Sequence, residues 1–303
     1  MDLSTSIIRD LLMYFTIFSI CAVAGMFSER SGIINMGLDG YMVIGALIYS
    51  IYGSKFNHST FGQITGIFVA LIFVGIFSLL HSFATIKLNC DHIIAGIAIN
   101  IFGEAIGLFV ATLPKFQGTF IASKYKPFYL DSQNVISLYL FISIIVSCAV
   151  GLYFTFTKVG RKHIAAGENP NALDVVGVSV NKYRFIAVTI SSMMAGFAGI
   201  AYCILKGSGS YFGSVNGYGY IALAIMVAGQ WRTIYCLLFS AIFSATFAIV
   251  PFLTSYQAFS GLKNYEELLN AIPFAISLMV MVFVSKKSSP PKASGQPFIK
   301  IRR

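Results

Sequence analysis

Long apolar runs alternate with short polar intervals along almost the whole chain. A membrane-spanning helix needs about 20 predominantly apolar residues. We therefore expect an all-α polytopic membrane protein with nine spans, at residues 11–28, 36–54, 62–86, 92–113, 135–156, 184–206, 214–229, 233–254 and 267–284. The seventh is short and opens on three glycines. We expect such glycine-rich elements to be broken or re-entrant, which membranes tolerate only beside protein or a water-filled cavity.

Charge sets the expected orientation. The chain of 303 residues is 57% hydrophobic and 11% charged, which is unlike a soluble domain. Its net charge of +10 comes largely from a loop at 157–184 and a tail at 286–303. Basic residues collect on the cytoplasmic side of membranes, so we place both segments inside. The chain then divides into a transmembrane domain at 1–285 and a basic cytoplasmic tail at 286–303, which we expect to lie unstructured on anionic lipid headgroups.

Counting back through the spans gives the side of each remaining loop. Loops 114–134, 207–213 and 255–266 and the N-terminus are expected outside, and residues 87–91 and 230–232 inside.

The 157–184 loop, TKVGRKHIAAGENPNALDVVGVSVNKYR, carries signals for a short helix at 170–176. Asn169 suits the N-cap, Pro170 suits the first helical position, and Gly177 suits the left-handed residue after the end. The apolar side chains of this helix would form a knob for docking: Ala172, Leu173, Val175 and Val176. The alternative is an ordinary basic loop with a chance helix.

Two glycine-rich intervals carry polar side chains. In the first, FSERSGIINMGLDGYMVIGA, Asn35 and Asp39 are four residues apart and share a helical face. The carboxylate either caps the second span at the water interface or faces a polar cavity and binds a solute. The second, KGSGSYFGSVNGYGYIALA, contains Asn216 in a similar Gly-x-x-Asn pattern, either an internal repeat of the kind found in transporters or a coincidence.

The fourth span carries a stripe of small and polar residues on one face: Gly96, Asn100, Gly103, Glu104 and Gly107. Tight helix packing explains the glycines, with Asn100 as an interhelical hydrogen-bonding group. It does not explain Glu104, because an ionisable group near the middle of a span normally faces a bundle interior or a water-filled path. We expect Asn100, Gly103 and Glu104 to line a solute pathway together with Asn35, Asp39 and Asn216.

No metal site or catalytic centre is expected. The five cysteines form no CxxC pair, and the four histidines form no HExxH motif. The chain also lacks a GxxxxGK[ST] phosphate-binding loop.

Four stretches resemble the permease subunits of ABC importers of the simple-sugar and branched-chain amino-acid type, and above all permeases of bacterial nucleoside importers. They are SGIINMGLDGYMVIGA, DHIIAGIAINIFG, AAGENPNALDVVGVSVNKYRFIAVTISSMMAGFAGIAY and GYGYIALAIMVAGQW, in the same order over residues 20–250. The resemblance implies a type II importer in the bacterial inner membrane. Its partners would be a related second permease, a cytoplasmic ABC ATPase that holds ATP and magnesium, and an external solute-binding lipoprotein. This chain would hold no cofactor itself.

The resemblance also gives the loop helix a role, since it matches the family's coupling helix, which seats in a groove of the ATPase. The residues concerned are Gly167, Glu168, Asn169, Pro170, Ala172, Leu173 and Gly177. Two positions depart from the family pattern: Asp39 replaces a common glutamate, and Gln230-Trp231-Arg232 replaces a glycine-containing turn.

The expected function is therefore permeation of a nucleoside or simple sugar in an ATP-driven importer. The alternative is an ion-coupled secondary transporter of a small polar solute, in which Glu104 would be the ionisable group. A membrane-embedded enzyme is a third reading. Dependence of transport on an ATPase partner and ATP distinguishes the first two.

Overall fold

The computed structural model describes residues 3–56, 59–113, 116, 120–132, 134–255, 271–285 and 290–299. Within these ranges the fold is helical, and the β pairing consists of two isolated bridges, Ile121–Tyr211 and Tyr129–Ser137. The helices are α1 (Leu3–Glu29), α2 (Leu38–Lys55), α3 (Thr60–Ser82) with its π-helical extension η1 (Phe83–Lys87), α4 (His92–Ala111), α5 (Leu138–Phe156), α6 (Lys158–Glu168), α7 (Pro170–Val175), α8 (Val180–Leu205), α9 (Tyr218–Ala228), α10 (Thr233–Ser255) and α12 (Ile272–Ser285).

Side-chain caps define where several helices begin. The N-cap side chain accepts a backbone N–H of the first turn at Ser59 for α3, Asp91 for α4, Ser137 for α5 and Ser179 for α8. Such caps satisfy N–H groups that have no partner within the helix.

Each of the nine expected spans overlaps a helix, but nine spans are not confirmed. In the described residues six helices are long and apolar enough to cross a membrane: α1, α3 with η1, α4, α5, α8 and α10. The other three, α2, α9 and α12, have 18, 11 and 14 residues. At 1.5 Å per residue, α9 is only about 16 Å long, roughly half the hydrocarbon thickness.

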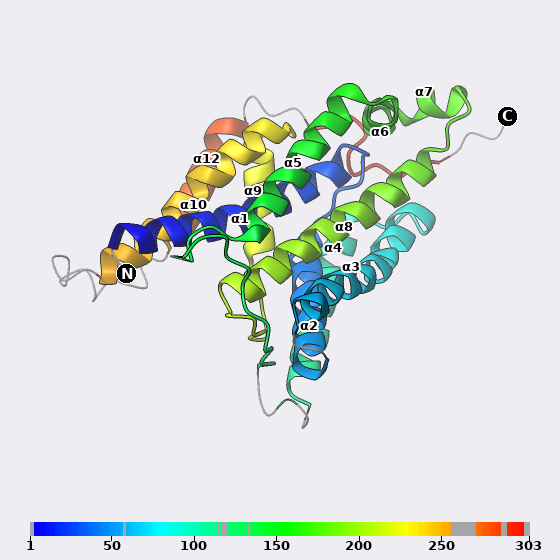
Figure 1. Ribbon diagram of the computed structural model, residues 1–303. Coiled ribbons are helices and arrows are strands. Elements are labelled where there is room, and N and C mark those ends of the chain that lie inside the picture. Colours follow the sequence, from blue (N-terminus) through cyan, green and yellow to red (C-terminus); the bar gives the residue numbers. More distant parts are fainter. Residues whose placement is uncertain are drawn as a thin grey trace.

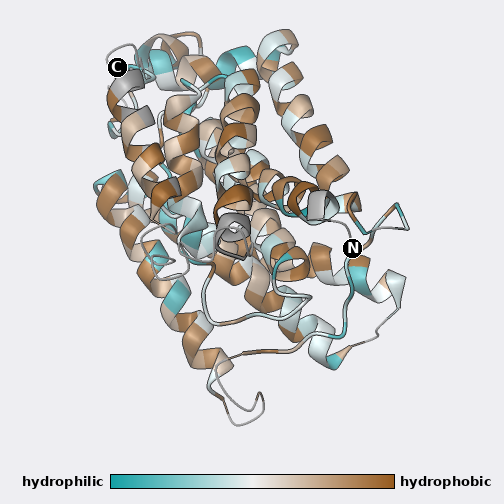
Figure 2. Ribbon diagram, turned by 90° about the vertical axis from the view of Figure 1, so that its left-hand side faces the viewer, coloured by the Kyte–Doolittle hydropathy of each residue, from teal (hydrophilic) through white to brown (hydrophobic). Residues whose placement is uncertain are grey.

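Helices α1 and α8 form the centre of the bundle, and α2 packs along α8 (Figure 1). In their most apolar stretches 78% of the residues of α1 and α8 are buried, against 33% in α3, α4 and α5. Glycines allow the close approach of α2 and α8, because a Cβ added at Gly199 would lie 1.9 Å from the carbonyl oxygen of Met42. Hydrophobic residues run along the helices, and hydrophilic ones are most frequent near their ends and in the connections (Figure 2).

The connections fall at two ends of the bundle. At one end, Ala293 N–H bonds to Gly167, Arg30 Nε to the Trp231 carbonyl, and Ile34 N–H to His92 Nδ1. At the other end, Ile121 pairs with Tyr211, and Lys124 N–H bonds to Gly53. The first end holds the segments expected inside: the 157–184 loop and residues 87–91 and 230–232. The second end holds the described parts of two loops expected outside, 114–134 and 207–213. Residues 256–266 of the third expected outer loop lie outside the described ranges.

The prediction of an unstructured tail on the lipid surface is wrong for residues 290–299. This segment packs against the protein, through backbone hydrogen bonds to Gly167 and Gly32 and the side chain of Phe298. Residues 286–289 and 300–303 lie outside the described ranges.

Candidate translocation and coupling sites

The starts of α2 and α9 meet inside the bundle. Neither start has a side-chain cap of its own, since both N-cap residues, Gly37 and Gly217, are glycines. Other helices supply the missing acceptors. Asp39 Oδ1 accepts the N–H of Gly219 at 2.8 Å, and Asn100 Oδ1 accepts the N–H of Gly40 at 2.8 Å. Backbone N–H groups away from water require partners, so these side chains stabilise two interior helix starts.

Asn100 joins three helices. Besides accepting from Gly40, its Nδ2 donates to the Met36 carbonyl oxygen and to the Tyr220 hydroxyl, each at 2.8 Å. The side chain is almost fully buried. The interhelical role anticipated for Asn100 is therefore observed, and the asparagine fixes the position of α9 against α2 and α4.

Glu104 lies one turn beyond Asn100, and its carboxyl group is beside that of Asp39. It is partly exposed, and Tyr220 is 41% exposed. With a rise of 1.5 Å per residue, Asn100 and Glu104 lie about 12 and 18 Å from the start of α4, which is about 30 Å long. Asp39, Asn100, Glu104 and Tyr220 thus form a polar cluster at mid-depth, which reaches the surface of the chain at Glu104 and Tyr220.

The glycines of the α4 stripe serve packing. A Cβ at Gly103 would lie 2.9 Å from the Cα of Gly40, and one at Gly96 would lie 2.6 Å from the Cβ of Met36. Gly107 has the same close approach to Tyr211. The expectation that Gly103 lines an open passage is therefore wrong: it is buried against α2.

Two expected pathway residues lie outside the polar cluster. Asn35 is fully buried, and its Nδ2 donates to Ser191 Oγ of α8 at 3.1 Å, so it acts as an interhelical bond. Asn216 is exposed, and its Nδ2 donates to the Tyr202 hydroxyl at 3.1 Å. Sequence reasoning missed Tyr220. The available signal was its position directly after Gly219, in the same glycine-rich interval as Asn216.

The short helix in the 157–184 loop is confirmed as α7. Asn169 Oδ1 accepts the N–H of Ala172 at 3.0 Å, Pro170 opens the helix, and Gly177 has φ of +79°. α6 precedes it and is capped by Thr157, which bonds to Gly160 N–H at 2.8 Å.

The apolar knob differs from the prediction at Leu173. Its side chain is buried against Ala166 and Val180, so its expected place on the exposed face is wrong. Val175 and Val176, 61% and 71% exposed, form the outward apolar surface, which we call the α7 face. The other residues assigned to coupling divide in the same way: Gly167 is buried, Pro170 is partly exposed, and Glu168, Asn169, Ala172 and Gly177 are exposed.

A buried histidine holds α6 against α1. His163 Nε2 lies 2.8 Å from the carbonyl oxygen of Phe27, which can only accept, so this nitrogen carries the proton. Nδ1 is then an acceptor, 3.4 Å from the Tyr153 hydroxyl. Burial lowers the pKa of His163 to about 4, so the imidazole is neutral near pH 7.

The turn between α9 and α10 is joined to the end of α1. Gln230 and Trp231 have positive φ, +50° and +54°, where the resemblance suggested a glycine. Trp231 Nε1 donates to Glu29 Oε2 at 2.6 Å, and Arg30 Nε donates to the Trp231 carbonyl at 2.8 Å. These bonds stabilise the turn although its two positive-φ residues are not glycines.

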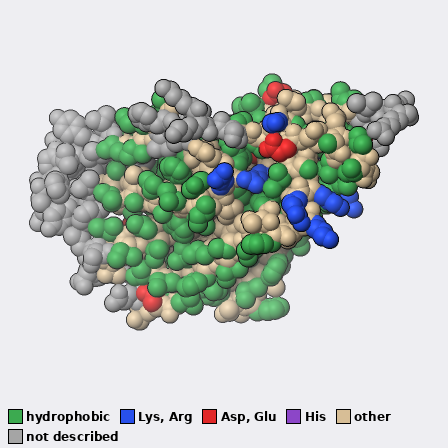
Figure 3. All heavy atoms as spheres, turned by 90° about the horizontal axis from the view of Figure 1, so that it is seen from above, with side chains coloured by type: hydrophobic (Ala, Val, Ile, Leu, Met, Phe, Trp, Pro, Cys, Tyr) green, Lys and Arg blue, Asp and Glu red, His purple; other side chains and the backbone are tan. Residues whose placement is uncertain are grey.

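Basic side chains gather near the α7 face. Figure 3 shows Lys and Arg side chains over the part of the molecule where α6 and α7 lie, while hydrophobic side chains cover much of the rest of this view. The exposed basic residues of the loop are Lys158, Arg161, Lys162 and Lys182.

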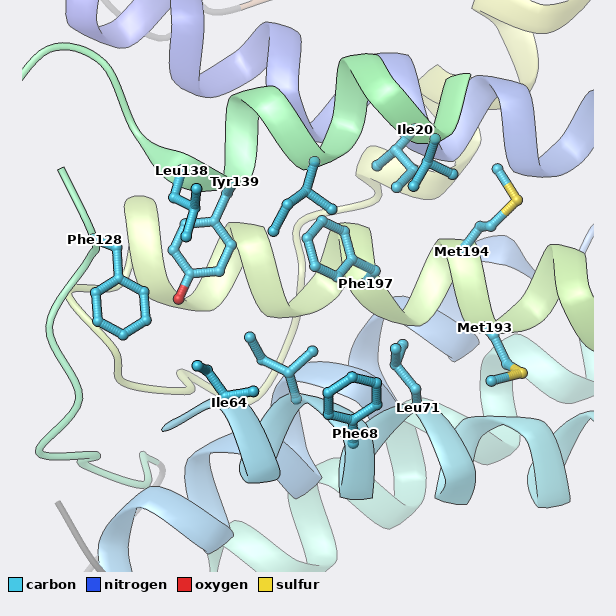
Figure 4. A pocket seen from close by; sticks show the side chains of 13 residues that line it. Ile20, Ile64, Phe68, Leu71, Phe128, Leu138, Tyr139, Met193, Met194 and Phe197 are labelled. Atoms are coloured by element: carbon cyan, nitrogen blue, oxygen red, sulfur yellow. The ribbon is translucent and has the colours of Figure 1, made fainter. Parts of the chain in front are cut away.

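A cavity of about 430 Å³ lies between α3, α5 and α8 (Figure 4). Its walls are aliphatic, aromatic and methionine side chains, such as Phe68, Met193 and Phe197. The hydroxyl of Tyr139 in this lining already bonds to Gln63 Nε2 at 2.8 Å. The cavity suits hydrocarbon, so the polar cluster is the better candidate for binding a polar solute.

These features define a multi-pass membrane protein with a polar cluster at mid-depth and a basic, helix-bearing loop at one end. The chain belongs to the family described as branched-chain amino acid transport system / permease component, whose model matches residues 7–285. It is thus a permease of the type II ABC importer class.

Individual proteins are similar to this chain over nearly its whole length. The nucleoside ABC transporter permease protein NupC of Lactococcus lactis is 30% identical, over 97% of this chain and 96% of its own length. The guanosine ABC transporter permease protein NupQ of Bacillus subtilis is 28% identical over 98% and 97%. An uncharacterized Mycoplasma pneumoniae protein is 32% identical over 93% and 92%. No solved structure matches the chain.

Proposed function

We propose that this chain forms one side of the translocation pathway of an ATP-driven importer and that the imported solute is a nucleoside. The nucleoside permease NupC and the guanosine permease NupQ support the nucleoside class, since each is similar to this chain over nearly its whole length. A simple sugar is the related possibility, because a nucleoside presents the same ribose hydroxyl groups.

One observation carries the proposal: Glu104 is partly exposed at mid-depth, beside Asp39 and Tyr220. A carboxyl group facing lipid at this depth would cost several kcal/mol. The face that carries Glu104 and Tyr220 is therefore expected to adjoin the second permease and a water-filled path. A phenol ring and carboxyl oxygens offer an uncharged solute both stacking and hydrogen bonds.

The two ends of the bundle support proposed positions for the remaining partners. The basic end with the α7 face would receive the cytoplasmic ABC ATPase, which binds ATP and magnesium. The opposite end, with residues 120–132 and 207–213, would receive the external solute-binding lipoprotein. In this proposal the chain works in a bacterial inner membrane and binds no cofactor of its own.

Gentle solubilisation followed by reconstitution tests the proposal. The copurified complex should contain an ABC ATPase and a second permease, and in vesicles it should import labelled guanosine only with ATP. Labelled ribose is the matched probe for the sugar alternative. Uptake driven by a proton or sodium gradient without ATPase would instead support a secondary transporter.

A further inference from the structure

Residues 290–299, which we call the strap, cross the inner end of the bundle between two loops. Ala293 N–H bonds to the carbonyl oxygen of Gly167, at the end of α6, at 2.8 Å. Two residues later, Gly295 N–H bonds to the carbonyl oxygen of Gly32, in the α1–α2 loop, at 3.0 Å. The strap therefore contacts both the 157–184 loop and the α1–α2 loop.

Arg184, on α8, bonds both to the α1–α2 loop and to the strap. The side chain is only 2% exposed, and it starts from the first turns of α8, at the last residue of the 157–184 loop. Its Nε donates to the Ser31 carbonyl oxygen at 3.2 Å, and its Nη1 donates to the Gln296 carbonyl oxygen at 2.8 Å. A buried guanidinium held by backbone carbonyls is costly to displace, since hydrogen bonds to charged groups are among the stronger ones.

Phe298 brings the strap to α7 itself. Its ring packs on the cluster that contains Leu173, Ala166 and Val180. It also lines a cavity of about 170 Å³ together with residues around the end of α7, including Asp174 and Gly177. Leu173 is the buried side chain of α7. A displacement of α7 must therefore either shift the Phe298 ring or disrupt its packing on the Leu173 cluster.

The α1–α2 loop continues this connection towards the polar cluster. Gly295 is close to Ile34, because a Cβ added to Gly295 would lie 2.9 Å from Ile34 Cδ1. Five residues after Ile34 comes Asp39, which accepts the hydrogen bond of Gly219 at the start of α9. The route from α7 thus runs through packed and hydrogen-bonded residues as far as Ile34, and from Ile34 to Asp39 it follows the backbone.

We propose that the strap is a transmission element, which passes displacement of α7 through the α1–α2 loop to the start of α2 and the polar cluster. This inference rests on the proposed function, in which an ATPase partner moves α7. Chains of packed side chains and hydrogen bonds can carry coupling between two sites, and the strap supplies such contacts between the α7 region and the α1–α2 loop.

Two adjacent residues allow a matched test. Phe298→Asp places a charge in the Leu173 cluster, whereas Ile299→Asp places the same charge on a neighbour that is 73% exposed. Phe298→Leu keeps an apolar side chain and serves as the rescue. In Phe298→Asp we expect the ATPase to stay bound and active while the ratio of uptake to ATP hydrolysis falls about tenfold, within the usual range of coupling energies. Ile299→Asp and Phe298→Leu should stay close to wild type.

Hydrogen exchange of the purified complex gives a readout that needs no transport. In Phe298→Asp, amides of residues 30–37 should exchange faster as well as those of α7, and in Ile299→Asp neither should change. If the wild-type complex imports nothing, the proposed function is wrong. The exchange measurement would still show whether the strap connects α7 to the α1–α2 loop. Unchanged exchange at 30–37, an equal loss of coupling in Ile299→Asp, or loss of the ATPase from Phe298→Asp would each overturn the inference.

Discussion

The carboxylate of Asp39 accepts a hydrogen bond from the backbone N–H of Gly219, 180 residues later in the chain, at 2.8 Å. The bond joins the first turns of α2 and α9. A Cβ added to Gly219 would lie 2.4 Å from the Asp39 nitrogen, so the two backbones are in direct contact. An acidic side chain at a helix N-terminus also interacts favourably with the helix dipole.

Removal of this acceptor should destabilise the chain. Asp39→Ala leaves the buried Gly219 N–H without its partner, at a cost of about 1–3 kcal/mol. Asp39→Asn keeps an oxygen that can accept the bond and should cost less. Thermal unfolding in detergent measures the difference. Equal losses in the two variants would mean that the bond contributes little.

Gly103→Leu should impair assembly of the helix bundle, because the added side chain would clash with the backbone of α2 at Gly40. Overpacking of this kind costs about 1–3 kcal/mol or more. Ala105→Leu is the control, since Ala105 is exposed on the same helix. Folded yield and unfolding temperature report the effect. A Gly103→Leu variant that folds well but has blocked uptake would instead indicate that Gly103 lines the pathway.

The α7 face should determine ATPase binding through Val176. Val176→Asp places a charge in the expected contact, where an unpaired buried charge costs several kcal/mol. Copurification of the ATPase should fall strongly while the chain stays inserted. Val159→Asp, on the exposed side of α6, should have a smaller effect. Full ATPase recovery with Val176→Asp would remove α7 from the docking surface.

His163 should make the attachment of α6 sensitive to acid. Burial lowers the pKa of His163 from 6.5 to about 4, so folding favours the neutral ring. Its contribution is present above pH 6.5 and is lost as the pH falls towards 4. Between about pH 7.5 and about pH 5, wild type should lose roughly 2 kcal/mol more than His163→Gln, which does not titrate. Parallel stability profiles for the two proteins would contradict this role.

Local signals in the sequence predicted the helices well, and α7 most sharply. Asn169, Pro170 and Gly177 act within a few residues of one another, so their effect can be read without knowledge of the fold. Hydrophobicity gave the positions of the spans but not which of them cross the whole membrane. It does not reveal that α9 begins inside the bundle, where Gly219 bonds to Asp39.

Contacts between distant segments were beyond such reasoning. Periodicity showed that Gly103 and Glu104 share one side of α4, but not that Gly103 meets α2 while Glu104 reaches the surface. Leu173 was assigned to the exposed face of α7 because the other members of its hydrophobic cluster, such as Val180 and the partly buried Phe298, come from outside the helix. The strap depends on the bond between Arg184 and Gln296, 112 residues apart. The basic composition of the 286–303 tail suggested a lipid-bound segment instead.

Uptake of labelled guanosine and ATP hydrolysis, measured in the same vesicles for Glu104→Gln and wild type, would show whether the polar cluster lines the translocation pathway. Glutamine nearly preserves the volume of glutamate but removes the carboxyl group beside Asp39. We expect the complex to assemble and hydrolyse ATP as before, while guanosine uptake changes by about tenfold, as for one altered polar contact of about 1.4 kcal/mol. Normal uptake by Glu104→Gln would contradict the assignment of the polar cluster to the translocation pathway.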